Sequence, residues 1–293
     1  MVATMACAAV LGSGFAGVAA TATAAVPVRA AACGTPLSTG ELATITDLSD
    51  VDTVAGGDAL QRADEFADRN WKISEILVAH GDRRGLFALM DDVADRQTVL
   101  PLLHSGAGLA DPELQAQFYD GNYESWLRAL HAEFTGAPLP RHWTKYFDLA
   151  ATCTQSPAYT AMVGYNAHMS VDIPHSLAAA GIQGNDPDYF RVLDAIGANN
   201  SLIVSQTKAA YNADVGPLWR FYFLGEGLDL VTGPGVGSGQ LLRTVLAGVN
   251  AANLANGVAL QNPVTHDLTS AAIDAQWSVV DTALATLTQI HGL

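Results

Sequence analysis

The helical spacing of the apolar residues is the feature that most restricts how this chain can fold. In three long stretches, residues 59–77, 85–103 and 114–134, apolar side chains recur at steps of three and four residues, which places them on one face of an α-helix. Asp111 before Pro112 is typical of a helix start, and Gly136 is typical of a helix end. Strictly alternating runs and hairpin turn sequences are scarce. The sequence therefore predicts an all-α fold.

Residues 1–32 have the composition of a secretory signal peptide. They contain no Asp or Glu, and Arg29 is their single basic residue. Small residues follow the apolar run at Ala22-Thr23-Ala24 and at Arg29-Ala30-Ala31-Ala32, and such sites are cut by signal peptidases. The alternative is a buried, Ala-rich helix. We expect a cleaved signal peptide over 1–32, one all-α domain over 33–293, and a secreted, extracellular protein.

Composition excludes several classes of protein and partner. Hydrophobic residues make up 49% of the chain and charged residues 15%, which is too apolar for a disordered protein. Acidic residues outnumber basic ones 29 to 14 and no Lys/Arg cluster is present, so we expect no nucleic-acid partner. The most apolar later stretch, 241–260, is interrupted by Arg243 and three asparagines, so we expect no transmembrane span.

Two cysteines, Cys33 and Cys153, remain after removal of the predicted signal peptide. A pair of cysteines in an exported protein suggests one disulfide, here between the mature N-terminus and the middle of the chain. The alternative is a lipid anchor on Cys33. We rank this second because Ala30 stands three residues earlier, where lipoprotein signals usually have Leu.

Polar side chains interrupt an otherwise apolar helix over residues 159–178. At about 100° per residue, His168, Asp172 and His175 share one face of this helix, and Asn166 points to nearly the opposite side. Pro174 cannot donate a backbone hydrogen bond, so it frees an acceptor and is expected to kink the helix beside these residues.

This pattern allows two kinds of chemistry and one structural role. Imidazole nitrogen and carboxylate oxygen suit zinc or another divalent metal, whose bound water becomes a nucleophile. His168, Asp172 and His175 would then be ligands. His131 is the preferred additional ligand because its aromatic-rich helix is expected in the core, and His142 is a further candidate. Without metal, His168 would act as a general base oriented by Asp172. The alternative is a helix-stabilising contact or a packing cluster, with no chemical role.

Several motifs resemble known helical families. Trp126-Leu127, Trp143, Gly164-Tyr165-Asn166-Ala167-His168 and Asp172-Ile173-Pro174 resemble a mainly bacterial domain of unknown function with a Gly-x-Asn-Ala-His-x3-Asp-Leu-Pro core. The resemblance covers about residues 115–212, and its motif includes Asn166, His168 and Asp172 but not His175. The His-x3-Asp step is also similar to that of the zinc-dependent phospholipase C and P1-type nuclease group, which implies a secreted all-α enzyme with zinc.

We therefore predict a secreted helical hydrolase that acts on a small-molecule, phosphoester or lipid-like substrate, with or without a divalent metal. Asn166 would orient the substrate or a ligand. His168 and Asp172 would bind the metal or act as base and orienting group. Arg243 would neutralise a buried carboxylate such as Asp172 or extend to solvent. The alternative hypothesis is a non-catalytic binding or structural protein in which the Asn/His/Asp cluster only ties helices together.

Overall fold

The computed structural model describes residues 29–184, 186–216 and 249–291, and within these ranges the chain forms helices and no strand. The predicted all-α fold is confirmed for this part of the chain. Residues 249–260 are helical, and the other helices are α1 Thr39–Ser49, the short 3-10 helix η1 Val51–Thr53, α2 Ala59–His80, α3 Gly85–Ala94, α4 Leu100–Ser105, α5 Pro112–Thr135, α6 Arg141–Ala150, α7 Pro157–Ala167, α8 Ile173–Ala180, α9 Pro187–Ala198, α10 Asn200–Tyr211 and α14 His266–His291.

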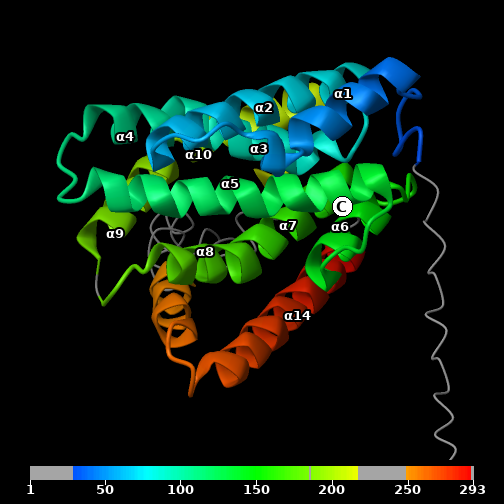
Figure 1. The fold of residues 1–293 in the computed structure, drawn as a ribbon. Helices are drawn as coiled ribbons and strands as arrows, with labels where there is room; N and C mark the ends of the chain where they lie inside the picture. The colour runs from blue at the N-terminus through cyan, green and yellow to red at the C-terminus, as the bar shows by residue number, and fades with distance from the viewer. Residues whose placement is uncertain (1–28, 185, 217–248, 292–293) are drawn as a thin grey trace, which may run out of the picture.

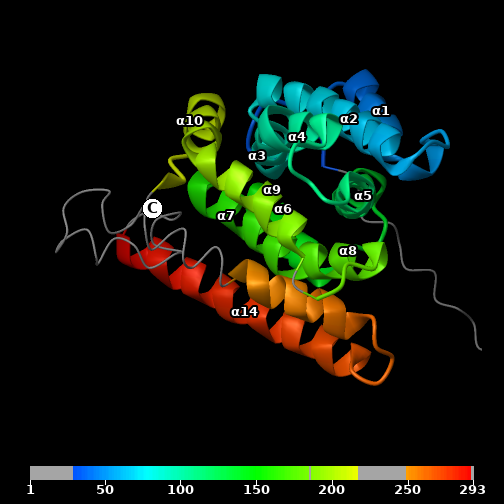
Figure 2. The same ribbon diagram turned by 90° about the vertical axis from the view of Figure 1, so that its left-hand side faces the viewer.

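The helices pack in layers around the long helix α5. Helices α1 to α4 lie on one side of α5, and α7 and α8 lie on the other (Figures 1 and 2). Helix α14 and the helix of residues 249–260 form an outer layer beneath α7 and α8. Helices in neighbouring layers bury their apolar faces against each other, which is how amphipathic helices make a core.

Local sequence signals set the ends of several helices as predicted. The side chain of Asp111 accepts a hydrogen bond from the backbone N–H of Leu114 at 3.0 Å and so caps the start of α5. Gly136 ends the same helix in the left-handed conformation, with φ of 71°. The segment from Pro187 to Tyr211 forms two helices, α9 and α10. They are separated at Asn199, whose side chain donates to Thr98 Oγ1 at 2.8 Å.

The core is rich in aromatic residues. The rings of Phe87, Trp126 and Trp143 contact one another edge-on or tilted, with centroids 4.8 to 5.2 Å apart. Gly164 lies so close to this cluster that an added Cβ would be 2.9 Å from the ring of Tyr146 and 3.2 Å from Phe87 Cβ. The glycine thus lets α7 approach α3 and α6 closely, and it positions the polar residues that follow it.

Two five-residue π segments interrupt the helices on either side of the core. The first π segment is η2, Asp95–Val99, and the second is η3, His168–Asp172. In each, the N–H that follows the segment bonds five residues back, to the carbonyl of Asp95 or of His168. A proline stands two residues after each segment, at Pro101 and Pro174. Because proline lacks the N–H that a regular helix needs, each of these prolines removes one backbone hydrogen bond of the α-helix, at the same position relative to its π segment.

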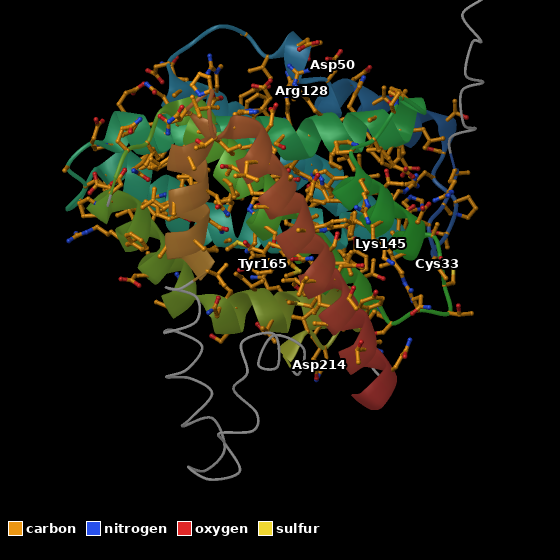
Figure 3. All side chains as sticks on the ribbon, turned by 90° about the horizontal axis from the view of Figure 1, so that it is seen from below. Cys33, Asp50, Arg128, Lys145, Tyr165 and Asp214 are labelled. Carbon is orange, nitrogen blue, oxygen red and sulfur yellow. A yellow bond between two sulfur atoms is a disulfide. The ribbon has the colours of Figure 1, made fainter. Side chains whose placement is uncertain are left out.

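The outer layer covers the second π segment. Trp277 of α14 packs with Val171 and Ile273, and the guanidinium of Arg141 lies 5.1 Å from the centre of the Trp277 ring. Lys145 of α6 is 3.8 Å from Asp281 of α14, and Figure 3 labels this lysine beside the helix. These contacts hold α14 across the helix that carries the predicted site.

The described fold begins at Arg29, four residues before the predicted domain boundary. The Arg29 carbonyl accepts a hydrogen bond from the buried Arg84 guanidinium at 3.0 Å, and the Ala32 N–H donates to Asp82 Oδ2 at 3.0 Å. Ala32 is only 1% exposed. Residues 1–28 of the predicted signal peptide lie outside the described residues.

The predicted disulfide joins Cys33 to Cys153, with the two Cα atoms 5.1 Å apart, and Figure 3 shows Cys33 at the edge of the molecule. It uses the Cys33 thiol, which the alternative lipid anchor would require. Within the described residues, no helix combines the length and apolar composition needed to cross a membrane.

Candidate functional site

A cavity of about 440 Å³ lies between the two π segments. Its walls come from α3 and the first π segment, α5, α7, the second π segment and the start of α8, α9, α10 and the helix of residues 249–260. Most of the lining is aromatic or aliphatic, and it includes Phe87, Met90, Phe118, Tyr119, Tyr165, Met169, Ile173, Phe190, Leu193, Ile196 and Ile203. The polar lining residues are Asp91, Asp95, Asn122, His168, Asp194, Asn200 and Asn250.

The π segments bring their first residues, Asp95 and His168, to the cavity from opposite walls. One extra residue in a helical turn rotates everything after it by about 100° relative to an uninterrupted helix. The two segments therefore redirect side chains that regular helices would have placed elsewhere. Single π turns of this kind are frequent at functional sites.

His168 is buried, neutral and only partly hydrogen-bonded. It is 8% exposed, its ring centre lies 5.0 Å from that of Phe87, and its Nε2 is 3.4 Å from Asn122 Nδ2. Because the amide nitrogen donates to Nε2, we assign the ring proton to Nδ1, which has no hydrogen-bond partner. Burial lowers the pKa of His168 to about 4, although the charge of Asp172 opposes the shift.

Asp172 lies beside His168 but is held by another helix. Its Oδ2 is 4.0 Å from His168 Nδ1, too far for a hydrogen bond, and accepts from Trp143 Nε1 at 3.2 Å. Its Oδ1 is 3.3 Å from His142 Nε2. Asp172 does not line the cavity. The structure therefore brings the predicted pair together and adds His142, while the carboxylate is used mainly to tie α6 to the second π segment.

Asn166 faces away from the cavity, on the α14 side of its helix. Its Nδ2 donates to the Trp277 carbonyl at 3.2 Å, and its Oδ1 accepts from Ser170 Oγ at 2.8 Å. The side chain is fully buried. Its position opposite His168 follows from their spacing, and its contacts are those of a packing residue.

The other predicted metal ligands are not brought to His168. His131 Nδ1 is 3.1 Å from the Thr46 carbonyl and ties α5 to α1. His175 is exposed on α8, because the extra residue of the π segment rotates it off the face that His168 occupies. Among the described residues, no three or more His, Cys, Asp or Glu side chains are grouped as a metal site. Arg243 lies outside the described residues.

Two shielded acidic residues that were not among the predicted site residues, Asp91 and Asp95, line the cavity. Asp95 is 4% exposed, and burial raises its pKa to about 7; the charge of Asp92 adds to the rise and the Tyr123 hydroxyl opposes it. Burial, with the charges of Asp95, Asp92 and Asp172, holds the pKa of Asp91 well above its usual range. The sequence does contain a signal for these residues, because Asp91 and Asp95 are acids one turn apart inside an apolar helix.

The described lining of the cavity offers His168 no serine or cysteine nucleophile. Among the described residues that line it, none is Ser, Thr or Cys, and none is Lys or Arg. His168 therefore has no Ser, Thr or Cys to activate among these residues, and its low pKa makes it a weak base.

Comparison with known proteins adds no relative: no family model matches the sequence, and neither the curated proteins nor the solved structures give a match. The resemblances to the domain of unknown function and to the zinc-dependent phospholipase C and P1-type nuclease group stay predictions.

Proposed function

We propose that this protein binds a small, largely apolar molecule in the cavity between the two π segments, without catalysing a reaction on it. The observation that carries the proposal is the cavity itself. Its volume of about 440 Å³ is within the range of ligand pockets, and its lining is mostly aromatic and aliphatic with a few polar groups. Close-packed interiors contain few voids larger than a water molecule, so a cavity of this size suggests an occupant.

The contacts around the predicted site favour binding over hydrolysis. Asn166 and Asp172 are used in packing between helices, which is the structural role that the alternative hypothesis gives them. A metal-dependent hydrolase would need a cluster of ligands, and a metal-free one that forms a covalent intermediate on Ser or Cys would need that side chain beside His168. Neither is brought together in the part of the chain that the structure describes.

The test is binding of an uncharged solvatochromic dye, with the cavity filled from either wall. Gly197 of α9 lines the cavity, and a Cβ there would meet no other atom within 4 Å, so Gly197→Phe has room to project. Ala94→Phe fills the cavity from α3. We expect both variants to lose at least tenfold in dye affinity. The matched control is Gly40→Phe, at an exposed helical glycine outside the cavity.

Equal dye binding by all four proteins, or no binding by the unmodified protein, would contradict the proposal. An ester substrate hydrolysed by the unmodified protein and not by His168→Ala would favour the hydrolase instead.

A further inference from the structure

We infer that the cavity takes an organic cation, a protonated amine on an apolar body, and that the carboxyl groups of Asp91 and Asp95 bind its charge. This inference rests on the proposed function and names the chemical class of the ligand. Both residues line the cavity, one helical turn apart, at the junction of α3 and the first π segment.

These two acids lack a protein cation, in contrast to three other shielded carboxylates of the described chain. Asp82 pairs with Arg84 at 2.6 Å, Asp92 pairs with Arg96 at 2.9 Å, and Asp120 pairs with Arg62. Asp91 and Asp95 form no ion pair with any described residue, and no Lys or Arg lines the cavity among those residues. Burying a carboxylate without a partner is costly, so a cationic ligand would remove a penalty that the empty cavity carries.

An independent observation points to the same kind of ligand. Asn122 lines the cavity from α5 and is 6% exposed, yet its Oδ1 has no hydrogen-bond partner. An amide oxygen is an acceptor, and its Nδ2 is already directed to His168. Together with the two carboxyl groups, Asn122 offers a third acceptor near the cavity, and a primary ammonium group has three donors.

The apolar part of the lining suits a cation as well. Phe87, Phe118, Tyr119 and Tyr165 contribute aromatic rings to the wall, and aromatic faces attract organic cations through their quadrupole. An anionic ligand, such as a phosphoester or a fatty acid, would instead meet acidic groups and no Lys or Arg among the described lining residues.

The test compares three ligands with one apolar body: 4-phenylbutylamine, 4-phenylbutanol and 4-phenylbutyrate. Each is measured by calorimetry and by displacement of the uncharged dye near pH 8, where the acids are most ionised. We expect the amine to bind at least tenfold more tightly than the alcohol, and the carboxylate to bind least. In Asp91→Asn and Asp95→Asn, dye binding should persist and the preference for the amine should fall at least fivefold.

Asp92→Asn is the matched control, since this residue is on the same helix but is paired with Arg96 and is not part of the lining. It should keep the preference. Equal affinity for amine and alcohol would overturn the inference and leave the proposed cavity function intact. The same conclusion would follow if the preference for the amine survived in both Asp91→Asn and Asp95→Asn. Failure of the dye and of all three ligands to bind would instead overturn the proposed function.

Discussion

Replacement of Asp95 by Asn should stabilise the protein above neutral pH, and the structure sets the size of the effect. Burial raises the pKa of Asp95 to about 7, against about 3.9 for an unfolded chain. The folded state therefore holds its proton more tightly, and stability falls as pH rises through the interval between these values. At about 1.4 kcal/mol per pKa unit, the full penalty above pH 7 is on the order of 4 kcal/mol.

The gain expected for Asp95→Asn is smaller than this penalty. The charge of Asp95 helps to raise the pKa of Asp91, so neutralising Asp95 lowers the cost of ionising Asp91. The Asn amide also needs partners of its own. We expect a gain of about 1 to 3 kcal/mol near pH 8 that is mostly lost near pH 4, where Asp95 is protonated in the folded state and about half protonated in the unfolded state.

Urea unfolding followed by tryptophan fluorescence measures the difference, at several pH values between about 4 and 8. Asp194→Asn is the control, because it makes the same substitution at a cavity acid that is exposed rather than buried. A difference that does not change with pH, or a loss of stability near pH 8, would refute the argument that an unpaired buried carboxylate weakens the fold.

Three further predictions concern the fold around the cavity. Cys153→Ala should lower the free energy of unfolding by about 2 to 5 kcal/mol, because its disulfide to Cys33 closes a long loop, and a reducing agent should affect only the unmodified protein. A chain that begins at residue 33 should be less stable than one that begins at residue 26 by about 2 to 4 kcal/mol, since it loses the backbone partner of the buried Arg84; equal melting curves would refute this. Asn166→Ala should cost about 1 to 3 kcal/mol in stability while leaving dye affinity unchanged, and an affinity loss without destabilisation would indicate a ligand contact instead.

Much of the fold could be predicted because its signals are local. Apolar spacing and caps at Asp111 and Gly136 depend on residues within one or two turns, where the chain bonds to itself. The disulfide followed from there being only two cysteines left to pair. The rotation per residue of an α-helix was enough to predict that His168 and Asp172 converge and that Asn166 points the opposite way.

Tertiary structure alone decided what these residues face. The second π segment changed the helical phase, so His175 turned to solvent, while Asp95 lies one regular turn after Asp91 and faces the cavity with it. Packing assigned Asp172 to Trp143 and left Asp91 and Asp95 without a cation among the described residues. Burial and charge pairing depend on side chains far away in the sequence, brought together by the whole arrangement of helices. The helical pattern of the sequence therefore determined where the helices form, whereas the packing of those helices determined which acids of the cavity have no cationic partner among the described residues.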